Sequence, residues 1–228
     1  MKIASYLKTS LIDYPGEVSS VLFLQGCPWR CEYCHNPELV LPEQMQPRLS
    51  TDAVVRSLLN YRSRISAITI TGGEPTTQPN LVKWMKLFRE SGFKIKLDTN
   101  GNYPRRLEKI LQEAPPDFIA MDVKTDAKSY LKLVKHRCSD SILTSISLIE
   151  TSGIEHEFRT TVVEDYHLPS RMQRLFEMIP SSSPYILQGF IPSDKMVGTW
   201  RDYAATSSAY LQLTLKAAIA FGLKASLR

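Results

Sequence analysis

The chain has 228 residues, of which 43% are hydrophobic and 22% are charged, as in a folded globular protein. This length fits one large domain with a continuous core, so we expect residues 1–228 to form a single domain. Basic residues outnumber acidic ones by 28 to 23, which gives a net charge of +5. Because no stripe of basic and aromatic residues accompanies this charge, the sequence does not indicate nucleic-acid binding.

Neither a signal peptide nor a membrane-spanning run is evident, so we expect a cytoplasmic protein without membrane association. The four cysteines are too few for a disulfide scaffold, and three of them lie within residues 27–34. This clustering favours metal binding in a reducing compartment. Cys138 stands apart in a lysine-rich stretch, and we interpret it as a buried or incidental thiol.

Apolar, β-branched runs alternate with helical patterns along the chain. They predict helices that begin near Thr51, Asn80, Pro104 and Ser170, and Thr51 is expected to cap the first of them. They also predict a broken helix over 126–152 and a last helix over 207–221. The strands are predicted at 18–24, 67–71, 94–98, 118–122, 157–163 and 185–189. Such alternation implies parallel βαβ units, in either a doubly wound sheet or a barrel. Polar residues directly follow the first four strands and no Gly-rich dinucleotide fingerprint occurs, so we predict an α/β fold, an incomplete (β/α)6 TIM-like barrel with parallel strands.

Cys27, Cys31 and Cys34 occupy a loop, about residues 25–50, that follows the first predicted strand. Soft thiolates bind zinc or iron-sulfur clusters. A structural zinc ion would need four protein ligands, and His35 is poorly placed to share a metal with its neighbour Cys34. Three thiolates on a four-iron cluster leave one iron open to an exogenous ligand. The spacing therefore favours a [4Fe-4S] cluster, with a zinc site or a redox-sensing loop as alternatives.

The pattern Cys-x3-Cys-x2-Cys, with an aromatic residue before the third cysteine, resembles the signature of the radical S-adenosylmethionine (SAM) superfamily. The resemblance implies a [4Fe-4S] cluster held by Cys27, Cys31 and Cys34, with SAM as a second cofactor. It also implies that Tyr33 and His35 line the adenine pocket. In that family one electron from the cluster cleaves SAM, and the 5′-deoxyadenosyl radical then abstracts a hydrogen atom.

The segment from Thr71 to Pro75 follows the second predicted strand and contains Gly72, Gly73 and Glu74. A Gly-Gly turn by itself usually only ends a strand. Glycines also let the backbone approach a ligand closely, and Glu74 adds a carboxylate. After a cysteine loop of this kind, the segment resembles the one that grips the amino group of SAM.

Polar residues also follow the third and fourth predicted strands. Taken singly, each would be a turn residue or a surface ion pair. Together they are similar to patterns of the glycyl radical enzyme activases, whose Asp-x-Lys motif binds SAM. The resemblance implies SAM contacts for Asp98, Asn100, Asp122 and Lys124, with Lys124 on the SAM carboxylate. Asp98, Thr99 and Asp122 are also expected to hold a monovalent cation.

Arg159 lies within an apolar strand, where a charge needs a carboxylate partner or a ligand. By the resemblance it touches SAM or Glu74. Near the end of the last predicted strand this chain has Gln188-Gly189-Phe190, where the pyruvate formate-lyase activases carry a histidine, and Gln188 is counted among the expected SAM contacts. This departure weakens the match to that branch.

The segments Lys8–Gly16 and Tyr33–Leu39 look closest to the anaerobic ribonucleoside-triphosphate reductase activating proteins. The resemblance implies an activase that abstracts hydrogen from a glycine Cα of a partner enzyme, an anaerobic ribonucleotide reductase. A flavodoxin- or ferredoxin-like protein would donate the electron. The alternatives are a pyruvate formate-lyase-type activase, a radical SAM enzyme acting on a small molecule as deazapurine synthases do, and a non-catalytic zinc or iron-sulfur scaffold.

Overall fold

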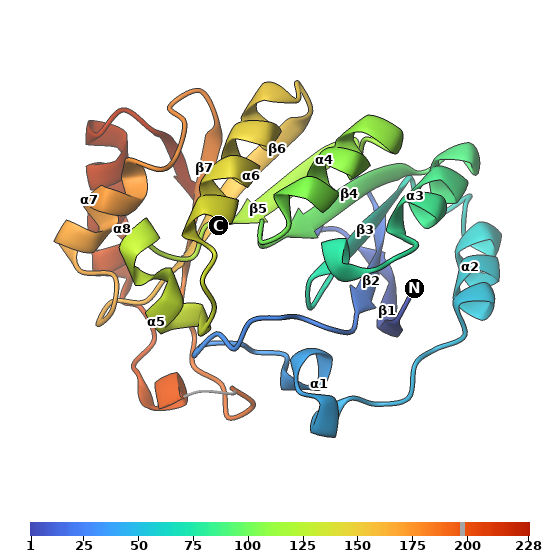
Figure 1. The fold of residues 1–228 in the computed structure, drawn as a ribbon, viewed down its shortest axis with the longest axis horizontal. Coiled ribbons are helices and arrows are strands. Elements are labelled where there is room, and N and C mark those ends of the chain that lie inside the picture. Colours follow the sequence, from blue (N-terminus) through green and yellow to red (C-terminus); the bar gives the residue numbers. More distant parts are fainter. Residues whose placement is uncertain (197–198) are drawn as a thin grey trace. The chain divides into compact units, whose positions relative to one another are not determined.

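A computed structural model describes residues 1–196 and 199–228 (Figure 1). The chain divides into two compact units. The first comprises Met1–Pro28, Asn36–Thr99 and Arg105–Ile119, and the second comprises Trp29–His35, Asn100–Pro104 and Ala120–Arg228. The expectation of a single domain over 1–228 stays a prediction.

The first unit is built on β1 (Ile3–Ser10), β2 (Ser19–Leu24), β3 (Ala67–Gly72) and β4 (Lys94–Thr99). β1 runs antiparallel to β2, whereas β2, β3 and β4 are parallel to one another. In the register of β2 and β3, Leu24 lies opposite Gly72. The carboxyl ends of the parallel strands β2, β3 and β4 therefore meet at one edge of the sheet, which is the edge at which α/β proteins place their ligands.

Helices α2 (Thr51–Asn60), α3 (Leu81–Glu90) and α4 (Pro104–Glu113), with the short α1 (Pro37–Val40), contribute apolar side chains to this unit. β2 and β3 are buried along most of their length, as expected for parallel strands covered on both faces. The expected cap at Thr51 is wrong by one residue. The hydroxyl of Ser50 accepts the hydrogen bond from the Ala53 backbone N–H at 3.4 Å.

The chain passes through β5 (Phe118–Asp122) into the second unit, where β6 (Glu155–Val162), β7 (Pro184–Gly189) and β8 (Lys224–Leu227) are parallel neighbours. α7 (Pro169–Phe176) and α8 (Ser208–Ala220) pack side by side (Figure 1). The break predicted within 126–152 is confirmed. A 3-10 turn and α5 (Tyr130–Val134) are separated from α6 (Ser139–Thr151) by Lys135, whose φ of 58° ends α5.

The predicted α/β class, with parallel strands in an unclosed sheet, is confirmed, and all six predicted strands are present. The sequence patterns missed β1 and β8. β1 mixes polar and apolar residues and is mostly exposed, and β8 has only four residues. Both therefore lack the continuous apolar run that identifies a buried strand. In the described ranges no helix is long and apolar enough to span a membrane.

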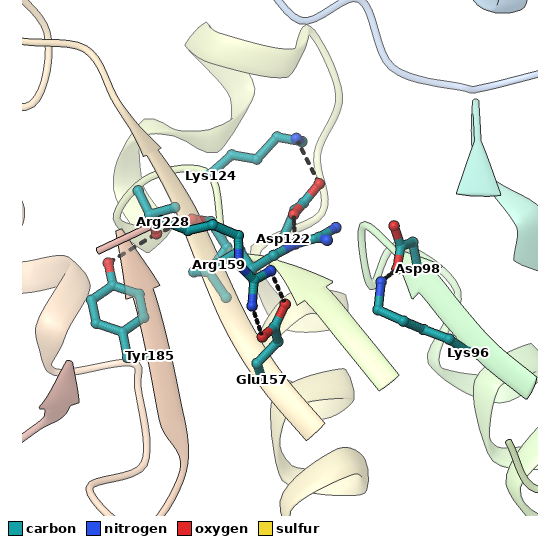
Figure 2. A network of polar contacts seen from close by, with 10 residues as sticks. Lys96, Asp98, Asp122, Lys124, Glu157, Arg159, Tyr185 and Arg228 are labelled. Atoms are coloured by element: carbon teal, nitrogen blue, oxygen red, sulfur yellow. Dashed lines mark hydrogen bonds and ion pairs between the residues drawn. The ribbon is translucent and has the colours of Figure 1, made fainter. Parts of the chain in front are cut away.

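The Glu157 side chain on β6 is buried, and its two carboxylate oxygens accept hydrogen bonds from the two terminal nitrogens of Arg228, each at 2.7 Å (Figure 2). Arg228 directly follows β8, so this pair ties the end of β8 to β6. A buried carboxylate that loses its partner is strongly destabilising.

We expect Arg228→Met to lower the free energy of unfolding by roughly 2–3 kcal/mol, because it strands the Glu157 carboxylate. The further change Glu157→Gln should recover part of this loss by removing the stranded charge. Urea denaturation measures both. The exposed pair of Arg201 and Asp202, 3.8 Å apart, is the matched control, and Arg201→Met should change stability by less than about 0.5 kcal/mol. Equal effects of the two arginine variants would contradict a structural role for Arg228.

Candidate functional site

The three clustered cysteines are divided between the two units. Cys27 belongs to the first unit and is half-buried, whereas Cys31 and Cys34 belong to the second. The backbone N–H of Cys34 donates to the carbonyl of Cys31 at 3.1 Å, so these two residues close one tight turn. The second unit thus presents two thiols on a single turn.

The Trp29–His35 segment is held in the second unit by the end of α5. The Arg30 N–H donates to the Val134 carbonyl at 3.0 Å, and Glu32 forms an ion pair of 2.8 Å with Lys135. Lys135 has the left-handed conformation that ends α5. A backbone bond and a charge pair therefore fix the loop on both sides of Cys31.

Tyr33 and His35 contact the segment that follows β7. The Tyr33 ring stacks on Trp200 with centroids 5.6 Å apart and an interplanar angle of 25°, and it meets Phe190 edge-on at 6.5 Å. Nε2 of His35 lies 2.8 Å from the Ile191 carbonyl. Trp200, in a 3-10 turn over Thr199–Asp202, was not singled out from the sequence. The adenine-pocket role of Tyr33 and His35 stays a prediction.

The chemistry of this loop suits a metal centre held by thiolates. Burial raises the pKa of Cys31 to about 12, although the charge of Lys124 opposes the rise, so a metal ion that binds this sulfur must displace its proton. The Tyr33 hydroxyl and the Trp29 Nε1–H are buried and have no hydrogen-bond partner within the described part of the chain. Each of these buried donors costs folding free energy, because no acceptor compensates for the water that it has lost.

Residues 1–196 and 199–228 contain no set of three or more His, Cys, Asp or Glu side chains grouped around a single metal position. Since Cys27 and the Cys31–Cys34 turn lie in different units, the convergence of the three thiols stays a prediction.

Gly72 and Gly73 lie against the backbone of the β2 end, directly before Cys27. A Cβ atom on Gly72 would lie 2.3 Å from the Leu24 nitrogen, and one on Gly73 would lie 2.3 Å from the Gly26 carbonyl oxygen. Gly72 also has a φ of 117°, which disfavours any other residue. The sequence predicted a close backbone approach to a ligand here. The structure shows that the approach is made first to the neighbouring strand.

Glu74 is fully buried beside these glycines. Its backbone N–H donates to the Gly26 carbonyl at 2.8 Å, and its carboxylate accepts from the Thr76 N–H at 3.0 Å and from the Thr99 hydroxyl at 2.8 Å. The Thr99 hydroxyl comes from the end of β4. Glu74 therefore links the ends of β2, β3 and β4 within the first unit.

Asp98 on β4 pairs with Lys96 on the same strand (Figure 2). Lys96 is 1% exposed and was missed from the sequence. Its signal was available, because Lys96 interrupts an apolar strand just as Arg159 does. The monovalent cation at Asp98, Thr99 and Asp122 remains a prediction. Both carboxylates already have cationic partners, and the Thr99 hydroxyl donates to Glu74.

Asp122, Lys124 and Arg159 point toward one another in the second unit (Figure 2). The Asp122 carboxylate receives Arg159 Nε at 2.9 Å and lies 3.3 Å from Lys124 Nζ. Burial would raise the pKa of Asp122, but the two cations outweigh burial and lower that pKa to about 2. Arg159 therefore pairs with a carboxylate, as expected for a charged residue within an apolar strand. Its expected contacts with SAM or Glu74 stay predictions.

The main chain of Lys124 is held by two side chains that sequence reasoning missed. Its N–H donates to the Tyr130 hydroxyl at 3.0 Å, and its carbonyl lies 3.0 Å from Nε2 of His167. His167 is fully buried and its Nδ1 accepts from the Val163 N–H at 2.9 Å, so Nε2 carries the proton. No local sequence signal marks His167 as a partner of Lys124.

Asn100 and Gln188 complete the expected SAM contacts. Asn100 is buried, and its side-chain oxygen accepts from the Asn102 N–H at 3.0 Å, which closes the turn after β4. Gln188 on β7 lies opposite Thr161 on β6, two residues beyond Arg159, and therefore on the sheet face of Arg159. Their contacts with SAM stay predictions.

We expect Gly72→Ala to lower the free energy of unfolding by more than about 3 kcal/mol, because backbone atoms of Leu24 block the added methyl group. Gly16 is the matched control. It has a φ of 76°, and nothing lies within 4 Å of an added Cβ. Gly16→Ala should cost only about 1–2 kcal/mol, the price of the left-handed backbone. Denaturant titration compares them, and equal losses would show that the contact with Leu24 is unimportant.

Acid should destabilise the protein through His167. Burial lowers the pKa of His167 to about 4, against 6.5 when exposed, so between these values the unfolded chain binds more protons than the native one. Stability is complete above pH 6.5 and falls by about 3 kcal/mol as the pH drops to 4. His167→Gln should flatten this pH dependence in urea titrations. An unchanged slope would contradict a neutral buried His167.

Two curated proteins resemble the chain over most of its length. A putative glycyl-radical enzyme activating enzyme of Methanocaldococcus jannaschii is 30% identical over 200 residues, covering 84% of this chain and 81% of that protein. The pyruvate formate-lyase-activating enzyme of Clostridium pasteurianum is 28% identical over 167 residues, covering 71% and 68%. A solved structure, a domain of a pyruvate-formate lyase-activating enzyme from Bacteroides vulgatus, matches 72% of this chain and 99% of that domain with a TM-score of 0.57. Its sequence identity is 18%, so this match supports the fold alone.

The family model of the radical SAM superfamily matches residues 21–169, more than half of the chain. The matched range includes the cysteine loop, the Gly72–Glu74 segment, Asp122, Lys124 and Arg159. Membership of this superfamily implies a [4Fe-4S] cluster and SAM as cofactors. The chain belongs to the radical SAM superfamily, in the branch of the glycyl radical enzyme activating enzymes.

Proposed function

We propose that this protein removes a hydrogen atom from a glycine Cα of a partner enzyme, and that the partner is an anaerobic ribonucleotide reductase. The observation that carries the activase role is the 30% identity to an activating enzyme across 84% of the chain. The residues that resemble reductase-activating proteins, Lys8–Gly16 and Tyr33–Leu39, support the choice of partner.

In this proposal Cys27, Cys31 and Cys34 hold the [4Fe-4S] cluster. The cluster and SAM together supply the one-electron chemistry that generates a carbon radical. The protein has to bind SAM, orient it and keep water away, because radical hydrogen transfer needs closeness and a dry site. No side chain has to act as a general base.

Asp122, Lys124 and Arg159 suit the binding of an anionic group. One carboxylate faces one ammonium and one guanidinium, which leaves a local net charge of +1. A SAM carboxylate would neutralise this charge, as the Asp-x-Lys resemblance implies. The Tyr130 and His167 contacts hold the Lys124 main chain in place for that role.

A pyruvate formate-lyase is the second candidate partner, because the chain is 28% identical to an activating enzyme of that class. The histidine expected after the last strand in that class is replaced by Gln188-Gly189-Phe190, which favours the reductase. A flavodoxin- or ferredoxin-like electron donor and a cytoplasmic location complete the proposal.

The test is anaerobic incubation of the reconstituted, reduced protein with SAM and either candidate partner. We expect a glycine-centred doublet in the electron paramagnetic resonance (EPR) spectrum with the reductase. Cys31→Ala and Cys34→Ala should each abolish it, because each removes a cluster ligand. Cys138→Ala is the control and should retain the signal, because Cys138 lies outside the three-cysteine motif.

If the doublet formed only with pyruvate formate-lyase, that enzyme and not the reductase would be the partner. Rapid SAM cleavage with a small metabolite, without a doublet on either protein, would contradict the activase role. One zinc ion and no iron in the purified protein would contradict the cluster itself.

A further inference from the structure

Residues 127–141, which include a 3-10 turn, α5 and the start of α6, form a basic patch in the second unit. Four side chains of this patch are basic and one, Asp140, is acidic, whereas basic and acidic residues are nearly equal in number over the whole chain. Lys128, Lys132 and Arg137 are exposed, and no carboxylate of the described residues pairs with them. Positive charge is therefore concentrated on this surface.

The carboxylates next to the basic patch leave this charge in place. Asp126 is buried, and it pairs with Arg171 and Arg174 from α7. Glu32 pairs with Lys135 at 2.8 Å and neutralises only that one basic residue of the patch. The patch thus keeps a surplus of positive charge that a negatively charged partner can neutralise.

The basic patch also contains a hollow of about 430 Å³, whose lining includes Lys128, Leu131 and Arg137. Leu131 is 48% exposed on α5, between the two exposed lysines of the patch in the sequence. Specific interfaces combine apolar contacts with a charged rim. The patch offers a partner both kinds of contact.

The carboxyl end of α5 joins the basic patch to the cysteine loop. The Val134 carbonyl accepts a hydrogen bond from the Arg30 N–H at 3.0 Å, and Arg30 directly precedes Cys31. Both segments belong to the second unit. One hydrogen bond therefore connects the α5 backbone with the loop, so a protein bound to α5 lies close to a cluster held by Cys31 and Cys34.

We infer that the basic patch docks an acidic electron-carrier protein, which passes one electron by way of α5 to the cluster. The carrier is oxidised by one electron and the cluster is reduced by one, so the step needs no other reactant. The inference rests on the cluster and the electron donor proposed above. Opposite charges speed the encounter of such partners, and redox complexes are small and short-lived.

This exposed patch suits an electron carrier better than the glycyl radical enzyme. An electron can cross the protein from α5 to the loop, whereas hydrogen abstraction requires the glycine Cα to reach the radical itself. A surface that is joined to the cysteine loop through backbone is therefore sufficient for the carrier.

The first experiment measures binding to the reconstituted protein at low salt by calorimetry, with an acidic flavodoxin and an acidic two-iron ferredoxin as probes. Combining Lys128→Glu with Lys132→Glu should weaken the tighter complex at least about tenfold, because two attractive charges become repulsive. Lys83→Glu with Lys86→Glu, at two exposed positions of α3, makes the same change in net charge and should alter binding less than about twofold. Added salt should weaken the wild-type complex.

A second pair of variants tests the apolar contact. Leu131→Ala should weaken binding about three- to tenfold, because it removes apolar area that the carrier would cover. Leu7→Ala on β1 is the matched control, since Leu7 is also 48% exposed, and it should leave binding unchanged.

The second experiment measures release of 5′-deoxyadenosine from SAM. With the reduced carrier as electron source, the Lys128→Glu and Lys132→Glu double variant should be about tenfold slower than the wild type at low carrier concentration. With dithionite, a small reductant that requires no docking surface, the two proteins should be equally fast.

Equal carrier binding by the two double variants would overturn the inference, and so would a wild type that binds neither carrier. A Lys128→Glu and Lys132→Glu variant that binds the carriers normally but loses the reductase would assign the patch to the glycyl radical enzyme instead. If dithionite drove no SAM cleavage in the wild type, the proposed cluster chemistry would fail, and the binding measurements would still decide whether the patch docks a carrier.

Discussion

The close backbone contact between the ends of β2 and β3 organises the first unit. Gly72 and Gly73 approach Leu24 and Gly26 so nearly that no side chain fits between them, and two backbone hydrogen bonds of 2.8 Å join the segments. Glu74 then enters the interior, where Thr99 from the end of β4 satisfies its carboxylate. One steric constraint therefore sets the path of the chain into Cys27 and the place of a buried carboxylate.

In the second unit, pairs of opposite charges organise the strands. Asp122 joins Arg159 and Lys124, and Glu157 joins Arg228 (Figure 2). Burying a charge such as that of Glu157 is unfavourable unless a partner compensates it, so the pair with Arg228 stabilises the contact between the end of β8 and β6. Asp122, Lys124 and Arg159 together carry a net charge of +1, and Lys124 Nζ lies 5.5 Å from the ring of Tyr33 in the cysteine loop.

The sequence alone identified the three cysteines, the Gly72–Glu74 segment and the Asp122–Lys124 pair, because these residues are neighbours in the chain and their spacing is itself the signal. It also identified the six parallel strands, whose apolar runs reflect burial on both faces. Arg159 followed from a general rule, since a charge within an apolar strand requires a partner. The same rule would have found Lys96.

Only the tertiary structure decided which partners those residues meet. Arg159 pairs with Asp122, His167 holds the Lys124 carbonyl, and Trp200 covers the Tyr33 ring. These contacts join residues between about 37 and 167 positions apart, and no local pattern encodes such separations. The sequence thus determined the chemistry that this protein carries. Long-range packing determined which buried groups have hydrogen-bond partners, because burial and pairing exist only once distant segments meet.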